Sequence, residues 1–276
     1  MSPKSKSTAG KRRDDLQRIK EALHAASSLL LRFYAAGVKT EFKSPGDPVT
    51  AADRAVNSLL CEMLVREGDG WLSEESTNDP SRLGKARVWV VDPLDGTREF
   101  IARCPEWSVS IGLVEQGQAV AGGVCNPVTG EVIIGSLETG IVEGAEARPL
   151  SSPAESGIPT VLASRSEMDR GEWDCFRGAP FSIRAVGSVA YKLALVAAGR
   201  AEATWTFVPK NEWDVAAGVA LVNSGRGEVW TLDGQAPVFN RPEPLLEGLI
   251  AISARGRKLH GKALDEWLRR SRKGIT

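Results

Sequence analysis

Between Arg87 and about Glu143 the chain is a series of short β-rich runs, and this stretch constrains the fold more than any other. The runs are VWVV, WSVSIGLV, AVAGGVC and EVIIGS, and the breaks between them include the turn-forming segments EQGQ and PVTGE. Short β-rich runs at this spacing are typical of an antiparallel meander. We therefore expect one antiparallel sheet in the first half of the chain.

Helical patterns precede this sheet, and a mixed pattern follows it. Apolar residues from Leu16 to Phe33 recur at gaps of three and four, which predicts a helix lying on a core. A second helix is expected near Thr50, with Asp53 in its first turn at capping-box spacing. Residues 145–159 are rich in Ser, Pro, Gly and Glu and suit a connection between two lobes. Beyond them strands and helices alternate, which favours an α/β lobe.

These patterns together predict an α+β protein with three parts. Residues 1–13 are basic and polar and are expected to be a disordered tail, followed by an N-terminal α+β lobe over 14–147 and a C-terminal α/β lobe over 148–276 that completes the active site. The segment after residue 13 is an amphipathic helix and not an apolar signal core. A targeting or nucleic-acid role for the tail's five basic residues stays open: Lys4, Lys6, Lys11, Arg12 and Arg13.

Composition excludes several classes of function. The 276 residues include 35 Lys and Arg against 35 Asp and Glu, so no overall field attracts nucleic acid or an anionic membrane. No apolar run approaches the ~18 residues of a membrane span. The four cysteines lack C-x-x-C spacing, which argues against a zinc cage or a disulfide framework and suits a reducing cytoplasm: Cys61, Cys104, Cys125 and Cys175.

The segment from Val88 to Phe100, VWVVDPLDGTREF, is the first candidate for chemistry. A buried strand runs directly into Asp92 and Asp95, so a tight turn holds two carboxylates at the end of a strand. Gly96 permits conformations that bring backbone amides close to an oxyanion. The same residues also form ordinary Asp-Pro and Asp-Gly turns.

Three further acidic segments favour a functional role for this turn over an ordinary turn: SEES at 73–76, PVTAAD at 48–53 and NEWDVAAG at 211–218. Carboxylates and carbonyls are the ligands that Mg²⁺ prefers, with phosphate oxygens and water completing its shell. His24 and His260 are the only histidines, and both lie in expected helices, so a histidine-based metal site or a Ser-His-Asp triad is poorly supported. Hydrolysis driven by a bound cation is the expected chemistry.

Together the four segments resemble the inositol monophosphatase superfamily, a group of magnesium-dependent, lithium-sensitive phosphatases, from the second expected helix onward. The resemblance implies a layered αβαβα sandwich of the sugar-phosphatase type and two or three Mg²⁺ ions. It also implies a set of metal ligands, which includes one backbone carbonyl: Glu74, Asp92, Leu94, Asp95 and Asp214. Ser73 stands where the family usually has glycine, and Arg226 lies between two glycines, as a solvated turn residue or near an anionic substrate.

Roles for the remaining site residues follow from the same resemblance. Asp53 and Thr97 are expected to orient and activate a water, with Asp53 as general base or, alternatively, only a helix cap. Amides of Gly96 and Thr97 are expected to hold the phosphate, and Asp214 is expected to contact substrate as well. Glu75 is expected to support the metal site, to bind an outer metal or simply to be solvated.

Three weaker signals resemble the CysQ-type 3′(2′),5′-bisphosphate nucleotidases. Glu99 precedes Phe100 where inositol monophosphatases usually have asparagine, and GSVAYK at 187–192 and FNRPEPL at 239–245 are similar to nucleotidase segments. Ser188 at a helix start and Lys192 one turn later are expected to bind a second phosphate, although a capped helix with a solvated lysine is the simpler reading.

The expected activity is hydrolysis of adenosine 3′,5′-bisphosphate to AMP and phosphate. An inositol or sugar phosphate is the alternative substrate, and a non-catalytic metal-binding regulatory protein is a distant second alternative. The expected partner is a small phosphorylated molecule, with no nucleic acid and no membrane. We expect a monomer or a homodimer.

Overall fold

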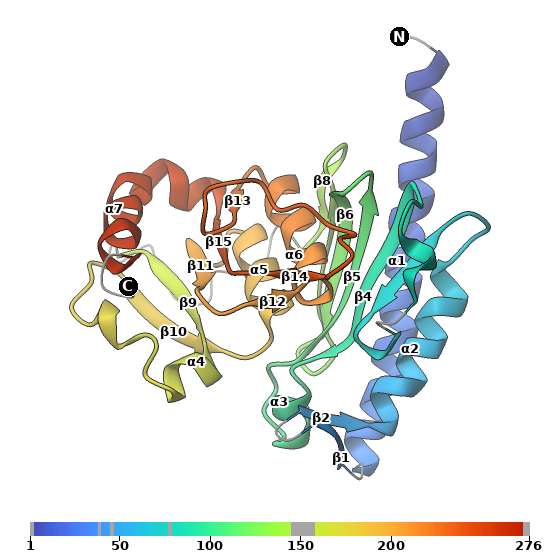
Figure 1. Cartoon of the computed structure of the whole chain (residues 1–276), viewed down its shortest axis with the longest axis horizontal. Coiled ribbons are helices and arrows are strands. Elements are labelled where there is room, and N and C mark those ends of the chain that lie inside the picture. The colour runs from blue at the N-terminus through green and yellow to red at the C-terminus, as the bar shows by residue number, and fades with distance from the viewer. Residues whose placement is uncertain (1–2, 38–39, 45–46, 77–78, 145–157, 273–276) are drawn as a thin grey trace.

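The computed structural model describes residues 3–37, 40–44, 47–76, 79–144 and 158–272, with side chains described for 10–37, 51–76, 79–144 and 158–267. The boundary expected between residues 147 and 148 and most of the connection at 145–159 lie outside these ranges. Within them the elements form alternating layers of helix and sheet (Figure 1).

The first layers contain two long helices and a six-stranded sheet. The helices are α1 (Pro3–Ala36) and α2 (Ala51–Leu64), with the small hairpin β1 (Thr40–Ser44) and β2 (Asp47–Thr50) between them. The sheet has the order β3-β4-β5-β6-β7-β8, parallel between its first two strands and antiparallel afterwards. Its strands are β3 (Gly70–Ser73), β4 (Arg87–Asp95), β5 (Ser108–Glu115), β6 (Gln118–Asn126), β7 (Glu131–Ser136) and β8 (Gly140–Glu143). The predicted meander is therefore confirmed.

Short turns of helix connect the strands that carry the acidic residues. They are η1 (Glu74–Ser76), η2 (Pro80–Arg82) and α3 (Thr97–Ile101). The first two lie between β3 and β4, and α3 follows directly after β4. These connections place the acidic segments at one end of neighbouring strands.

The second half of the chain forms a five-stranded mixed sheet with the order β10-β9-β11-β15-β13. Its strands are β9 (Thr160–Ser164), β10 (Ser182–Val186), β11 (Ala203–Thr206), β13 (Glu228–Trp230) and β15 (Leu249–Ile252). A separate pair is formed by β12 (Lys210–Asn211) and β14 (Leu245–Leu246). The helical elements are α4 (Arg165–Asp169), η3 (Asp174–Phe176), α5 (Val189–Ala197), α6 (Glu212–Ser224) and α7 (Ala254–Arg272).

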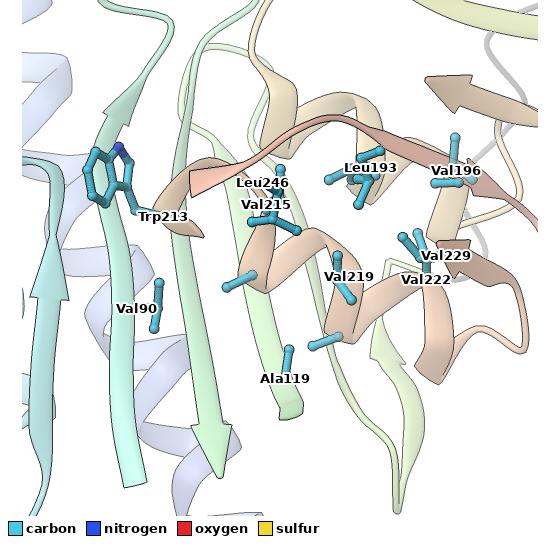
Figure 2. Close-up of a cluster of buried hydrophobic side chains, with 14 of the residues drawn as sticks. Val90, Ala119, Leu193, Val196, Trp213, Val215, Val219, Val222, Val229 and Leu246 are labelled. Carbon is cyan, nitrogen blue, oxygen red and sulfur yellow. The ribbon is translucent and has the colours of Figure 1, made fainter. Parts of the chain in front are cut away.

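Helices α5 and α6 lie between the two sheets and bury apolar side chains on both sides (Figure 2). Val219 and Val222 of α6 pack in one cluster with Val90 of β4 and Leu193 of α5. Helices α1 and α2 cover the other face of the large sheet, and α7 covers the outer face of the smaller one (Figure 1). The order of layers is α, β, α, β, α, which confirms the predicted α+β sandwich.

Glycine in the large sheet lets α6 approach unusually closely. A Cβ built on Gly122 of β6 would lie 2.6 Å from the carbonyl oxygen of Ala217, and one on Gly112 of β5 would lie 2.9 Å from the Ala217 amide nitrogen. Such distances are shorter than any ordinary contact. The backbone of α6 therefore rests directly on the sheet, which fixes the helix that carries Asp214.

The N-terminal segment differs from its prediction. Helix α1 begins at Pro3, so residues 3–13 form its first turns and not a disordered tail. Arg12 is 3% exposed and pairs with Asp15 (3.2 Å), Glu115 (2.9 Å) and Glu138 (2.9 Å). The prediction is wrong for Arg12 because three carboxylates, one on the same helix and two from the large sheet and its connections, compensate its charge. No described helix is both long enough and apolar enough to cross a membrane.

Candidate active site

The irregular end of β4, where the strand register shifts between Asp92 and Asp95, begins the site, and the Asp92 side chain shapes it. Oδ1 of Asp92 accepts a hydrogen bond from the Leu94 amide at 2.9 Å, which closes the Asp-Pro-Leu turn locally. Gly96 follows with φ +96°, a left-handed conformation that glycine adopts without strain. A Cβ there would lie 3.2 Å from the Cβ of Trp107, so the turn packs against the residue that precedes β5 as well.

Thr97 joins this turn to α2. Its hydroxyl lies 3.4 Å from Oδ1 of Asp53 and 3.2 Å from the Leu94 carbonyl oxygen. Asp53 lies in the first turn of α2 and is 2% exposed. The residues expected to activate water are therefore neighbours, although they are 44 positions apart in the sequence.

Asp95 is held from the other half of the chain. Its Oδ2 accepts hydrogen bonds from the Ser188 hydroxyl (2.6 Å) and the Ala190 amide (2.7 Å) at the start of α5. Ser188 has φ +57°, an uncommon conformation for a residue with a side chain, and its hydroxyl also accepts from the Tyr191 amide at 3.0 Å. A bond between lobes thus orients one of the expected metal ligands.

Asp214 lies in the first turn of α6, and the N-terminal end of this helix forms a capping box. Asp214 Oδ2 accepts the Asn211 amide at 3.0 Å, while the Asn211 side chain accepts the amide of residue 214. Gly112 of β5 and Gly122 of β6, described above, let the following turn of α6 pack closely against the large sheet. The helix start is thereby fixed in both direction and distance.

Burial and mutual repulsion act together on these acids. Burial raises the pKa of Asp92 well above its ordinary value, and the negative charges of Glu74, Asp95 and Asp214 raise it further. Burial also raises the pKa of Asp214, with Asp95 and Glu74 adding to the effect. The pKa of Asp95 is raised by burial, although the Ser188 hydroxyl, the Ala190 amide and two lysines oppose the rise. Acids in this arrangement gain stability when a cation joins them.

The donor set suits a magnesium ion, because every expected ligand is a carboxylate or carbonyl oxygen. In the part of the chain that the structure describes, no three His, Cys, Asp or Glu side chains already close on one point as a metal cage. The pKa shifts nevertheless show Glu74, Asp92, Asp95 and Asp214 to be electrostatic neighbours. Asp95 and Asp214 each accept their hydrogen bonds through Oδ2.

The two residues expected to bind a second phosphate are buried and bonded to other protein groups, which contradicts this prediction. Lys192 is 4% exposed, and its Nζ donates to the carbonyl oxygens of Ser188 (2.9 Å) and Val186 (3.3 Å). Burial lowers the pKa of Lys192 to about 8. Ser188 is buried and committed to Asp95. Both side chains are therefore bonded within the protein, so they are not available to a phosphate arriving from solvent.

Glu99 and Glu75 are half-buried. The Glu99 side chain lies over Gly187, where a Cβ would come within 2.7 Å of Glu99 Cγ. Burial raises the pKa of Glu99, and Arg165 is among the charges that oppose the rise. Glu99 therefore lies at the edge of the site, next to the turn of Gly96 and Thr97 that is expected to hold the phosphate. Glu75 lies in η1 next to Glu74.

Sequence reasoning missed Lys210, a half-buried partner of the site. Its Nζ lies 3.1 Å from Oε1 of Glu167, and its charge lowers the pKa of both Asp95 and Asp214. Lys210 immediately precedes the NEWD segment, so its position next to Asp214 was the available signal. Its buried partner Glu167 lies 43 residues earlier on α4, and no local pattern connects the two.

Comparison with known proteins agrees with this geometry. The profile described as "Inositol monophosphatase family" matches residues 13–274. An inositol-1-monophosphatase of Rhizobium meliloti is 32% identical over 84% of this chain and 87% of its own length. A 3′(2′),5′-bisphosphate nucleotidase CysQ of Salmonella typhimurium is 31% identical over 84% of this chain and 96% of its own length.

Solved structures give the same result. The crystal structure of CysQ from Bacteroides thetaiotaomicron superposes with a TM-score of 0.72 at 29% identity, covering 87% of this chain and 97% of that one. The extragenic suppressor protein suhB from Bartonella henselae gives 0.73 at 28% identity, over 90% and 97%. The order of layers, the carboxylates at the end of β4 and a match over nearly the whole length have one explanation, which is that this chain is a phosphatase of the inositol monophosphatase family.

Proposed function

We propose that this phosphatase is a magnesium-dependent 3′(2′),5′-bisphosphate nucleotidase, which hydrolyses adenosine 3′,5′-bisphosphate to AMP and inorganic phosphate. The observation that carries the metal-dependent reaction is the buried group of Asp92, Asp95 and Asp214, whose pKa values are raised by burial and repulsion. Carboxylates in that state bind a hard cation at a gain in free energy.

The cation is assigned to five oxygen donors: Glu74, Asp92, the Leu94 carbonyl, Asp95 and Asp214. When bound, Mg²⁺ supplies charge that activates a water and stabilises the departing oxygen. Amides of Gly96 and Thr97 at the start of α3 hold the phosphate. Water attacks phosphorus as the ester bond breaks, and its proton passes to the Thr97 and Asp53 pair, which lie 3.4 Å apart.

Asp53→Asn tests this assignment of the base. We expect turnover to fall by about 10²- to 10⁴-fold, because the variant cannot accept the proton, while the affinity for Mn²⁺ measured without substrate stays near wild type. If metal affinity collapses together with turnover, Asp53 is a ligand or a structural cap.

Support for a nucleotide substrate now rests on Glu99 and on the CysQ relatives, because Lys192 is buried. A different cation borders this side of the site. Arg165 follows β9, its side chain is 39% exposed, and it pairs with Glu106. Glu106 also accepts the Gly187 amide at 2.8 Å, and Gly187 packs against Glu99. We therefore assign the second phosphate of the nucleotide to Arg165.

A panel of three substrates at one Mg²⁺ concentration tests the specificity: adenosine 3′,5′-bisphosphate, inositol 1-phosphate and fructose 1,6-bisphosphate. We expect the nucleotide to have the highest kcat/KM. Arg165→Met should raise KM for the nucleotide by about 10-fold, the equivalent of ~1.4 kcal/mol, and leave inositol 1-phosphate unchanged. Equal losses on both substrates exclude the Arg165 assignment.

Inositol monophosphatase activity is the second candidate. It is favoured by the 32% identity to the Rhizobium meliloti inositol-1-monophosphatase and by the loss of Lys192 as a phosphate ligand. Higher kcat/KM for inositol 1-phosphate in the wild type supports this candidate. Glu99→Asn, which introduces the residue usual in inositol monophosphatases, should then leave the preference unchanged.

A further inference from the structure

We propose that Arg82, Asn240 and Glu212 form a clamp that positions Asp214 for metal binding. The clamp joins the connection between β3 and β4, which carries Glu74, to the first turn of α6, which carries Asp214. The inference rests on the proposed metal site and adds three positioning residues to it.

Arg82 and Asn240 are bonded to each other reciprocally. Arg82 is 2% exposed, and its Nη1 donates to Asn240 Oδ1 at 2.7 Å. Asn240 Nδ2 in turn donates to the Arg82 carbonyl oxygen at 3.1 Å. The second guanidinium nitrogen, Nη2, donates to the carbonyl oxygens of Arg241 (2.9 Å) and Pro242 (3.5 Å). A planar guanidinium has the donors to hold several acceptors at once, as it does here.

Glu212 holds the same segment from the other side. It is fully buried, and its carboxylate accepts the amides of Asn240 (2.7 Å) and Arg241 (2.9 Å). Burial raises the pKa of Glu212, while these two amides and the charge of Arg82 oppose the rise. Its own amide donates to the Pro244 carbonyl oxygen at 2.9 Å. A buried carboxylate bonded in this way fixes a short length of backbone very closely.

The backbone of Asn240 is also specialised. Its φ is +59°, a left-handed conformation that turns residues 240 and 241 so that both amides face Glu212. Asparagine is among the few residues other than glycine that adopt this conformation readily. Asn240 thus serves both partners, Arg82 through its side chain and Glu212 through its amide.

The position of the clamp relates it to the metal site. Glu212 is the first residue of α6, and Asp214 follows two positions later. Arg82 lies eight positions after Glu74, on the same connection. Ser73 pairs with Val91 in the sheet, so Glu74 follows beside Asp92. Ser110, which pairs with Asp92 on β5, donates its hydroxyl to the Trp213 carbonyl oxygen at 3.4 Å, so Asp214 begins next to the same strand. The clamp therefore sets how far apart these two carboxylates lie when a cation draws them together.

Asn240→Gly is the informative variant, because glycine keeps the left-handed backbone and removes only the side chain. Arg226→Gly is its matched control, since Arg226 has φ +61° and is exposed in the turn after α6. Mn²⁺ is the probe, and the unbound ion is counted by electron paramagnetic resonance with metal-free protein and no substrate. We expect Asn240→Gly to weaken Mn²⁺ binding by about 10-fold or more, as removal of residues that orient metal ligands does, and the control to bind as wild type.

Arg82→Lys and Arg82→Met provide the second test. Lysine keeps the charge but cannot hold three acceptors in one plane, so Arg82→Lys should show an intermediate loss of Mn²⁺ affinity and Arg82→Met the larger one. At saturating Mg²⁺, Asn240→Gly should recover most of its phosphate release. A residue that only braces the fold would lower the melting temperature without this shift in metal affinity.

The outcomes separate the clamp from the proposed metal site. If wild-type protein binds no Mn²⁺, the metal site itself is wrong. If wild type binds the ion and Asn240→Gly binds it equally well, the clamp is excluded and the metal site stands. If Asn240→Gly melts lower than Arg226→Gly but has unchanged Mn²⁺ affinity, the three residues are a structural brace, and the inference is overturned.

Discussion

Asp95 is an expected metal ligand, and its burial near other carboxylates is electrostatically unfavourable. It is buried among like charges, yet its Oδ2 accepts hydrogen bonds from Ser188 and Ala190. An asparagine side chain at this position would keep an oxygen acceptor for both bonds and remove the negative charge.

We therefore predict that Asp95→Asn reduces phosphate release to background and leaves the metal-free protein within about 1 kcal/mol of wild type or more stable. Urea unfolding in the presence of a chelator measures the stability, and a phosphate assay with Mg²⁺ measures the activity. Undiminished phosphate release by this variant would exclude Asp95 as a ligand. Val128→Ala, at an exposed position, is a suitable handling control.

Lys192 gives a prediction for pH dependence. Burial lowers its pKa from 10.5 to about 8 in the folded protein. Between pH 8 and 10.5 the unfolded chain therefore binds more protons at this residue than the folded chain does. Stability must rise with pH across that window, because folding releases a proton.

Comparison with Lys192→Met isolates this contribution. We expect the free energy of unfolding of wild type, measured relative to the variant, to rise from pH 8 toward pH 10.5, at a limiting rate of about 1.4 kcal/mol per pH unit. Chemical unfolding of the metal-free proteins at several pH values provides the measurement. A difference that is independent of pH would mean that Lys192 stays charged in the folded protein throughout.

At the scale of elements, the contact between α6 and the large sheet depends on glycine. A Cβ on Gly122 would come within 2.6 Å of the Ala217 carbonyl oxygen and 2.9 Å of its Cα, both of them backbone atoms that cannot rotate away. We predict that Gly122→Ala destabilises the protein by about 1–3 kcal/mol, because α6 must move. The loss should be accompanied by weaker metal binding, since Asp214 lies on the helix that shifts.

Gly10→Ala is the matched control. Gly10 is exposed on α1 with nothing within 4 Å of a Cβ, so alanine there should stabilise the helix by up to about 1 kcal/mol. Urea unfolding of both variants checks the pair. Equal small effects at the two positions would show that α6 accommodates a methyl group without moving.

Sequence patterns predict some of the helices and strands and not others. The helix from Leu16 to Phe33, the meander and the strands after Pro159 were predictable, because a periodicity of 3.6 or 2 reports which face is buried. The short strands β12 to β14 were not, since two or three residues carry no periodicity. Likewise, the turn carrying Asp92 and Asp95 could be located from local motifs alone.

What could not be predicted depends on partners distant in sequence. Lys192 looked like a solvated or anion-binding lysine, and only the packing of α5 between two sheets shows it buried. Arg12 was predicted to lie in a disordered tail, because its ion pairs with Glu115 and Glu138 join residues more than 100 positions apart. Arg82 and Asn240 are 158 positions apart, and no local pattern relates them.

At the scale of the whole molecule, the expected metal ligands come from both halves of the chain. Asp92 and Asp95 lie at the end of β4 in the large sheet, whereas Asp214 lies in the first turn of α6. Helix α6 packs between the two sheets (Figure 2). The apolar cluster around α6 includes side chains from both sheets' strands, among them Val90 and Val229. A bound cation would add a second connection across the same boundary.

We predict that Mg²⁺ stabilises the two halves together. Because the ion binds the folded state, a concentration of about 100 times its Kd should add about 2.7 kcal/mol to the free energy of unfolding. Calorimetry should show one transition that moves to higher temperature with Mg²⁺ and returns with a chelator. Asp214→Asn should lose most of this shift, because it removes the ligand supplied by the second half. If two transitions appear and only one responds to Mg²⁺, the ion is held by the first half alone, and Asp214 is not a ligand.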